Sequence, residues 1–353
     1  MIARVFQYSF AQARTKAMKG NLLDSEDWYY LSRMSKLDDV VRYLTGTTYV
    51  GILGGRSLTG LGSRALLRGF HEELFRAYER LMKVVPSSGR KLLETLLCRY
   101  EAENLKTILR GIWSARSASK IRSLLYPLER VSQLPIDELL QRKEIAEAAD
   151  LLKRTIFHEP LLRAMPHAIT QSSLFPLEIS LDTAAFEHLR SAVSSFKALS
   201  LDDAPALVGD LIDGVNLSWI VRLRHFYGLS PEETINHTLS GGCHLTLHDL
   251  GALARATDLQ GFVAVLPDVY RKSLGEAGQW AAISILFQRW FVGRLHRTFR
   301  RHPFQIGLQV AYLLLREMEV KALESILCAV ELAESPDKVA ALVSFPVRRA
   351  AGV

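Results

Sequence analysis

The sequence has few cysteines, and their placement excludes two kinds of small scaffold. Its 353 residues include three cysteines, Cys98, Cys243 and Cys328, which are odd in number and far apart. This spacing supports neither a disulfide framework nor a zinc cluster. It is typical of a protein from a reducing compartment.

Long apolar runs are also missing. A membrane-spanning helix needs about 20 mostly apolar residues. Charge-free stretches such as those near residues 277–288 and 303–315 are shorter than this and contain Gln or Gly. The N-terminus has no apolar core of the kind found in signal peptides. We therefore expect no direct membrane span, and a location in the cytoplasm or on a membrane through other proteins.

The excess of positive charge is small. Lys and Arg number 44 against 37 Asp and Glu, a net charge of +7, and basic residues crowd positions 289–301 and the tail at Arg348 and Arg349. A nucleic-acid-binding protein usually has a stronger bias and stacking aromatics on a recognisable module, and we find no such module. With 48% apolar and 23% charged residues, the chain has the composition of a globular protein of about two or three folding units.

Apolar residues recur at helical spacing along nearly the whole chain. Strand-like alternation is almost absent, and the nearest case is the short run 243–247. For the segment 91–112 we expect Ser87 or Ser88 as the N-cap, after a helix that ends before Pro86. The pattern predicts an all-α fold, compact throughout. The long helical stretches are about 63–85, 91–112, 182–199, 206–227, 278–301 and 303–333.

An internal repeat is the most informative feature of the sequence. An acidic residue is followed after three positions by a small or amide residue, then by Leu and an Ile-Leu or Ile-Val pair. The copies lie about 110 residues apart, which is the size of a small helical bundle and too long for solenoids with units of about 20–50 residues. We expect three similar bundles, residues 1–113, 114–229 and 230–353, with pseudo-threefold symmetry around a central hollow. The signature residues are Glu101, Asn104 and Arg110; Asp213, Asn216 and Arg222; and Glu319, Ala322 and Cys328.

The acid and the amide occupy one face of each signature helix, since three residues separate them. A buried polar group without a partner costs about 1–3 kcal/mol, so the pair must be hydrogen-bonded. One interpretation is that it lines the central hollow. The other, more usual for interior polar pairs, is that it fixes helix register. A second, weaker repeat is an aromatic residue 50–60 positions before the central residue of each copy. These aromatic residues are Tyr49, Phe157 and Tyr270.

Four stretches of the sequence resemble the C subunit of archaeal and bacterial A/V-type rotary ATPases, which is the d subunit of the eukaryotic vacuolar enzyme. The resemblance spans most of the chain in the right order. Ala322 stands where that family commonly has Asn, and Cys328 stands where the first two copies have Arg, so the third copy is expected to make a weaker or different contact. The stretches are 8–23 with 44–49, 100–110, 213–233 and 317–327.

The resemblance implies an all-helical funnel that sits on the membrane proteolipid ring and receives the foot of the central shaft. Such a protein turns with the rotor, performs no chemistry and needs no cofactor. The implied partners are the proteolipid ring and the central shaft subunits, without nucleic acid. The implied role is in ATP-linked proton or sodium transport, as a monomer within a hetero-oligomer, peripheral to the cytoplasmic side of the membrane.

Three short patterns suggest chemistry but fail on their details. Residues 55–62 resemble a phosphate-binding loop without its Gly-Lys-Ser/Thr, and His71-Glu72 begins a zinc-protease helix without the second His. Cys243, His244 and His248 are three potential metal ligands without an evident fourth. We therefore predict no catalytic, cofactor or metal residues.

The basic stretch 289–301 supports an alternative. Arg294, Arg297 and Arg301 are spaced for one helical face. They suit acidic loops of the ring, anionic lipid headgroups or another acidic partner, although an ordinary solvated face is the commoner meaning of such a run. The alternative function is a helical scaffold that binds an acidic partner or nucleic acid through this segment.

Overall fold

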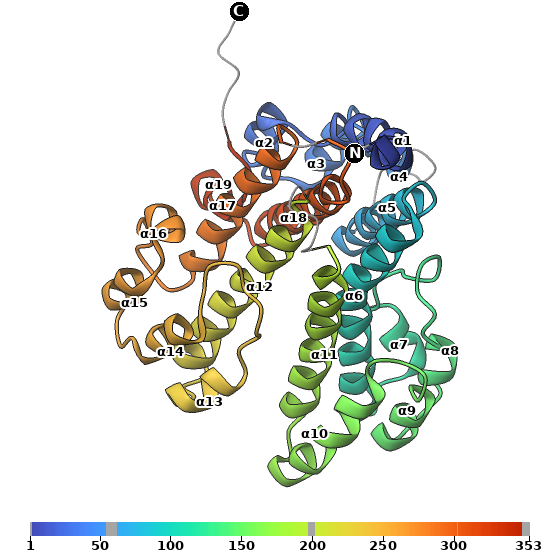
Figure 1. Cartoon of the computed structure of the whole chain (residues 1–353), viewed down its shortest axis with the longest axis vertical. Helices are drawn as coiled ribbons and strands as arrows, with labels where there is room; N and C mark the ends of the chain where they lie inside the picture. Colours follow the sequence, from blue (N-terminus) through green and yellow to red (C-terminus); the bar gives the residue numbers. More distant parts are fainter. Residues whose placement is uncertain (1, 54–61, 197–201, 302, 348–353) are drawn as a thin grey trace, which may run out of the picture. The chain divides into compact units, whose positions relative to one another are not determined.

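The computed structural model describes residues 2–53, 62–196, 202–301 and 303–347, which form helices joined by turns and loops (Figure 1). No described residue lies in a β-strand, so the predicted all-α fold is confirmed. The run 243–247 belongs to a loop whose last residue begins a helix. Residues 55–61 of the glycine-rich stretch and the tail arginines Arg348 and Arg349 lie outside the described residues.

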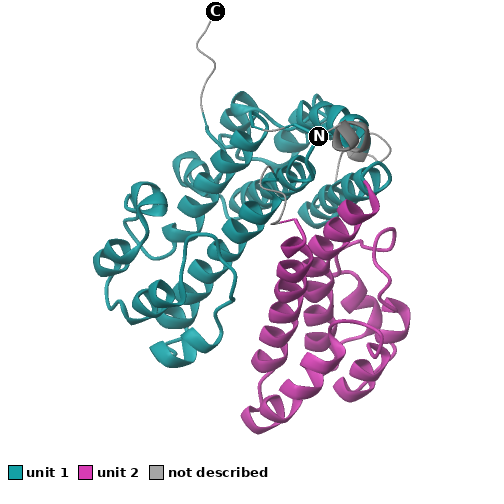
Figure 2. Ribbon diagram, in the orientation of Figure 1, with its two compact units in different colours: residues 1–85, 199–353 teal, residues 86–198 magenta. Residues whose placement is uncertain are grey.

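The chain divides into two compact units, which Figure 2 colours separately. Unit 1 consists of Met1–Val85 together with Leu199–Val353, and unit 2 consists of Pro86–Ala198. Unit 1 is therefore built from both ends of the chain, while unit 2 is one continuous segment.

Unit 2 is organised around two long helices. Its helices are α6 (Ser87–Trp113), α7 (Ala118–Arg122), α8 (Ile136–Leu139), α9 (Ile145–Leu151), α10 (His158–Gln171) and α11 (Phe175–Ser194). Helix α11 packs against both α6 and α10. Leu105 and Ile108 of α6 and Leu181 and Ala185 of α11 belong to its buried apolar core.

Unit 1 contains the remaining helices. From the N-terminal segment come α1 (Ile2–Lys19), α2 (Ser25–Leu31), α3 (Leu37–Leu44), α4 (Val50–Leu53) and α5 (Ser63–Met82). From the C-terminal segment come α12 (Ala204–Val221), the π-helical turn η1 (Arg222–Phe226), α13 (Pro231–Asn236), α14 (Leu247–Arg255), α15 (Leu259–Val265), α16 (Asp268–Leu274), α17 (Ala282–Thr298), α18 (Gly307–Glu331) and α19 (Pro336–Leu342).

Helix α18 is the centre of unit 1. Every residue from 305 to 320 is buried, and α18 packs against α1, α5, α12 and α17 (Figure 1). A helix surrounded in this way must be apolar on all sides or must pair its polar groups internally. Its buried polar residues include Arg316 and Glu319, which pair with each other.

Two sequence-based helix limits were wrong. Pro86, rather than Ser87 or Ser88, occupies the N-cap of α6, without a side-chain cap, because the serines already lie in the first turn. Helix α11 begins at Phe175, seven residues before the predicted start, since Pro176 in its first turn needs no hydrogen-bond partner for its nitrogen.

The three helices that carry the signature end in the same way. Each is followed by a residue with left-handed backbone, and two residues further on a serine occupies the N-cap of a short helix, α7, α13 or α19. A left-handed residue turns the chain out of a helix and satisfies its last carbonyl groups. The left-handed residues are Ala115, Gly228 and Ala333, and the serines are Ser117, Ser230 and Ser335.

Helix α12 with η1, Ala204–Phe226, has the length and apolar composition of a membrane span. However, 67% of its apolar window is buried inside the protein. A core helix has the same composition for that reason, so this one segment is weak support for a membrane span.

Candidate functional site

Both signature asparagines and two of the three signature acids are buried in the packed faces of their helices. Asn104 of α6, Asp213 and Asn216 of α12, and Glu319 of α18 are at most 1% exposed. Groups of this kind need partners, because an unpaired polar group in the interior costs free energy. Their partners show what the signature does.

The two signature asparagines bind the backbone in one common geometry. Asn104 donates from Nδ2 to the carbonyl oxygen of Tyr126 at 3.0 Å and accepts from the Tyr126 N–H at 2.7 Å. Asn216 makes the same pair of bonds with Leu239, at 2.9 and 2.7 Å. The side-chain amide of each asparagine thus bonds to both the N–H and the carbonyl of one loop residue, as a peptide group of a neighbouring strand would. That loop residue lies 22 or 23 positions further along the chain. Ala322 in α18 has no amide to do so.

The signature acids hold loops as well. Glu101 accepts the Ser132 hydroxyl at 2.5 Å. Asp213 accepts the N–H groups of Cys243 at 3.1 Å and His244 at 2.7 Å, and the hydroxyl of Tyr270 at 2.8 Å. These bonds tie the segment that follows each helix back onto the helix.

Glu319 does the same for the other end of the chain. Its Oε2 accepts the Leu23 N–H at 2.8 Å, and its Oε1 accepts the Tyr49 hydroxyl at 2.7 Å and pairs with Arg316. The Arg316 guanidinium also lies over the Tyr49 ring, 4.5 Å from its centroid. Burial raises the pKa of Glu319, and the nearby Arg316 charge opposes that rise.

The structure shows bonding partners for two of the three aromatic residues that precede the signature copies. Tyr49 and Tyr270 do pair with signature acids, but Tyr270 pairs with Asp213 and Tyr49 with Glu319. Tyr270 therefore belongs to the signature helix before it in the chain, and Tyr49 belongs to the last one. Burial raises the pKa of both tyrosines, so each remains a hydroxyl donor.

The signature arginines lie at the surface. Arg110 makes two bonds to Glu178 of α11, from Nε at 2.5 Å and from Nη2 at 2.9 Å, and its side chain is 55% exposed. Arg222 is exposed at the start of η1. Neither residue is joined to the acid and amide of its own signature.

The basic stretch is partly occupied by the protein's own acids. Arg294 lies 3.3 Å from Asp210 and 3.8 Å from Asp203, and its side chain is only 14% exposed. Arg301, which follows the end of α17, donates to Asp203 at 3.0 Å. Arg297 is exposed. Two of the three arginines that suited an acidic partner are therefore already paired with aspartates of unit 1.

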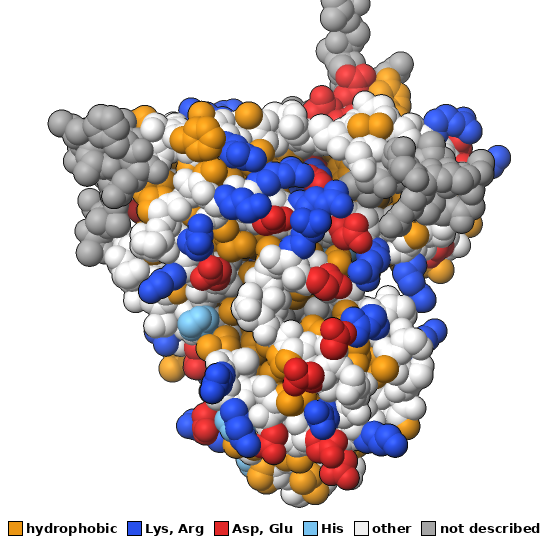
Figure 3. All heavy atoms as spheres, turned by 90° about the vertical axis from the view of Figure 1, so that its right-hand side faces the viewer, with side chains coloured by type: hydrophobic (Ala, Val, Ile, Leu, Met, Phe, Trp, Pro, Cys, Tyr) orange, Lys and Arg blue, Asp and Glu red, His pale blue; other side chains and the backbone are white. Residues whose placement is uncertain are grey.

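His71 and Glu72, which resemble the start of a zinc-protease helix, lie in the charged helix α5. In α5, Arg68 and Glu72 lie 3.3 Å apart, and Arg80 and Glu73 lie 2.9 Å apart. His71 Nδ1 lies 2.9 Å from the Leu67 carbonyl oxygen, and burial lowers the pKa of this histidine. Basic and acidic side chains are interspersed on the face drawn in Figure 3.

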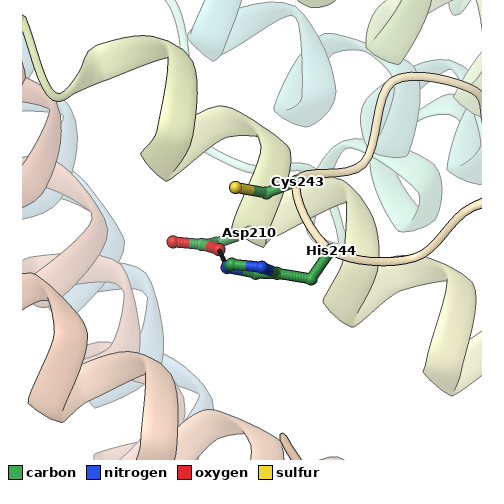
Figure 4. A group of neighbouring side chains, drawn as sticks. All are labelled: Asp210, Cys243 and His244. Atoms are coloured by element: carbon green, nitrogen blue, oxygen red, sulfur yellow. Dashed lines mark ion pairs between the residues drawn. The ribbon is translucent and has the colours of Figure 1, made fainter. Parts of the chain in front are cut away.

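The loop that carries Cys243 and His244 brings both residues beside Asp210 of α12 (Figure 4). His248, the third ligand suggested by the sequence, is exposed on α14 and does not join them. Asp210 lies three positions before Asp213, on the same helix, and the repeat pattern did not single it out.

Sequence reasoning also missed the serines that follow the signature helices. The signal was available, because Ser-Pro recurs at 230–231 and 335–336, and Ser117 precedes a further short helix. The signature residues and these turns together define an all-helical protein whose interior polar groups hold its own loops.

This chain belongs to the family described as ATP synthase (C/AC39) subunit, which matches residues 11–342. It is 25% identical to the C subunit of the A-type ATP synthase of Pyrococcus abyssi over 348 residues, covering 95% of this chain and 90% of that one. It is 23% identical to the protein of the same name from Methanocaldococcus jannaschii, covering 93% and 84%. The C subunit of the V-type ATP synthase of Deinococcus radiodurans is 26% identical over about half of each chain, 51% and 52%.

Replacing Asn216 should destabilise the protein. In Asn216→Ala, the N–H and carbonyl of Leu239 both lose their partner in a buried place, which costs about 1–3 kcal/mol per group. We expect the free energy of unfolding in urea to fall by about 2–4 kcal/mol. The control Asn236→Ala, at an exposed position, should change it by less than about 0.5 kcal/mol. Equal stability of the two variants would contradict the anchoring role.

Adding a methyl group at Gly242 should also be costly. A Cβ atom there would lie 1.9 Å from Asp213 Oδ1, and that oxygen belongs to a carboxylate held by several donors. We expect Gly242→Ala to lose about 1–3 kcal/mol of stability, measured by urea unfolding. The control Gly278→Ala has no atom within 4 Å of the new methyl and should be near neutral. A Gly242→Ala protein as stable as this control would refute the close approach.

Proposed function

We propose that this chain is a non-catalytic component of the central stalk of an A/V-type rotary ATPase, where it couples the shaft subunits to the membrane proteolipid ring for ATP-linked proton or sodium transport. The family match supports a place in an ATP synthase complex. The names of its relatives, the C subunits of A-type and V-type ATP synthases, support the same assignment.

The chemistry of the interior supports a role without catalysis. Asp213 and Glu319 accept bonds from backbone N–H groups and tyrosine hydroxyls of their own chain. Carboxylates used in this way hold structure and leave little capacity for a substrate. The assignment of no cofactor follows from the same proposal.

We further propose three repeated bundles, each beginning with its signature helix. The bonds of the signature residues on α6 and α12 run forward to the segment after each helix, so boundaries ahead of these two helices suit them better than boundaries near 113 and 229. We take the third bundle to begin at α18 in the same way. In each bundle the signature helix packs on a second long helix: α6 on α11, α12 on α17, and α18 on α5.

The third bundle then combines the two ends of the chain. Leu23 and Tyr49 bond to Glu319 as His244 and Tyr270 bond to Asp213. The same sequence distance separates Leu23 from Tyr49 and His244 from Tyr270. This correspondence supports a cyclic threefold plan, which suits the pseudo-threefold funnel that the family resemblance implies.

The observation that carries the proposed function is a large exposed apolar residue at the end of each signature helix. Trp113 is 51% exposed, Phe226 is 63% exposed and Leu332 is 68% exposed. An exposed apolar side chain at the same place in each proposed bundle offers a partner protein an apolar anchor. A contact that transmits torque needs a large buried area, about 2,000 Å² or more, between stiffly packed bodies.

The alternative function, a scaffold for an acidic partner or nucleic acid through residues 289–301, has less support. Arg294 and Arg301 both contact Asp203 of the same unit. The proposed location is peripheral, on the cytoplasmic side of the membrane, through the other components of the complex.

Binding to the two proposed partners tests the function directly. The purified chain should be retained by immobilised proteolipid ring and by the shaft subunits in separate pull-down experiments. Retention by neither would contradict the proposal. A gel shift with nucleic acid at low salt would instead favour the alternative.

Removing the exposed apolar ends should weaken one of these contacts. A variant combining Trp113→Ala, Phe226→Ala and Leu332→Ala should lose at least about tenfold in affinity for the ring or the shaft, because buried anchors contribute about 2 kcal/mol or more each. Its melting temperature should change little. Ile169→Ala, 70% exposed on α10, is the matched control and should bind as the wild type does. Unchanged affinity of the triple variant for both partners would rule out these three residues as docking anchors.

Deleting this chain from the complex should separate hydrolysis from transport. The head should continue to hydrolyse ATP, because its catalytic sites lie on other chains, whereas ATP-driven ion uptake into vesicles should fall to background. The measurement is hydrolysis and ion uptake in the same membranes. Uptake at the wild-type level without this chain would be incompatible with a coupling role.

A further inference from the structure

The loop 239–245 is held against α12 at more than one point. Asp213 accepts the N–H groups of Cys243 and His244, and Asn216 binds Leu239. Gly209 allows the close approach, since a Cβ atom there would lie 2.8 Å from the Cβ of Cys243. The loop therefore presents Cys243 and His244 at a fixed place on the helix, next to Asp210.

The donor atoms of these three side chains converge. His244 Nε2 lies 3.3 Å from Asp210 Oδ1, and one donor atom of each residue lies within 4.8 Å of the others (Figure 4). Zinc bonds to nitrogen and oxygen of about 2.0–2.1 Å set two tetrahedral ligand atoms about 3.3 Å apart. The His244 and Asp210 atoms already have this spacing, and the exposed Cys243 has its sulfur within 4.8 Å of them.

The surroundings of Asp210 also indicate a bound metal ion. Its side chain is fully buried, and its oxygens face the side chains of His244, Cys243 and Arg294. Arg294 Nε lies 3.3 Å from Oδ2, on the oxygen that does not face His244. A cation on Oδ1 would leave Arg294 in place as the group that orients the carboxylate, as is usual for partners of metal ligands.

We propose that Asp210, Cys243 and His244 bind one Zn²⁺ ion, with the fourth coordination position open to water. Thiolate, imidazole and carboxylate are the three ligand types that zinc takes in proteins. The ion ties the loop 239–245 to α12 beside the anchors at Asp213 and Asn216. The site is separate from the proposed docking residues, and its test does not depend on the proposed function.

Metal binding by the full-length chain tests the site. The protein is stripped with a chelator, kept reduced, and titrated with Zn²⁺ by calorimetry and with Co²⁺ by absorption spectroscopy. We expect one ion per chain and, with Co²⁺, a thiolate charge-transfer band. Cys243→Ser and His244→Gln should each weaken Zn²⁺ binding at least tenfold. The matched controls Cys328→Ser and His248→Gln, both at exposed positions, should bind as the wild type does.

Three results would overturn the proposal. These are no Zn²⁺ binding at millimolar concentration, equal binding by the wild type and the double variant Cys243→Ser/His244→Gln, and a Co²⁺ complex without the thiolate band. Both altered side chains are exposed, and melting curves without metal show whether each variant is folded.

Discussion

The structure depends on one interaction, the bonding of buried carboxylate and amide groups on long helices to the backbone of the segments that follow them. A loop laid against a helix core buries N–H and carbonyl groups that would otherwise bond to water. Asn104 and Asn216 supply a donor and an acceptor together, and Asp213 supplies acceptors alone. The helices can therefore be wrapped by their own loops without losing the apolar packing on their other faces. This explains why polar residues recur at the same positions in otherwise apolar helices.

The all-α fold and the signature residues could be predicted from the sequence because both depend on local spacing. The choice between a socket lining and a packing device could not be made from the sequence, since it depends on which groups the side chains meet. In the structure they bond to loops of their own chain. They therefore stabilise packing, as the second interpretation expected, but they fix a loop on a helix and do not set the register between two helices. The bonding partners of Tyr49 and Tyr270 could not be predicted either, because each pair joins segments that lie far apart in the sequence.

The metal candidates show the same limit. The sequence grouped Cys243, His244 and His248 by proximity along the chain, but a loop and a helix start place the third residue away from the first two. Asp210 takes that position from another element, 33 residues earlier than Cys243. The spacing of Arg294 indicates a surface charge, but the acids of α12 turn it inward. In each case a contact between distant segments decided the outcome.

The position of Glu319 has a consequence for how the polypeptide is made. This residue bonds to Leu23 across 296 positions, and its helix fills the centre of unit 1. During synthesis α1, α3 and α5 leave the ribosome long before α18 exists, so they lack the helix that they pack against until it has been made. Unit 2, a continuous segment, meets no such delay. Unit 2 can therefore fold before unit 1, and the exposed apolar faces of α1, α3 and α5 favour aggregation in the meantime.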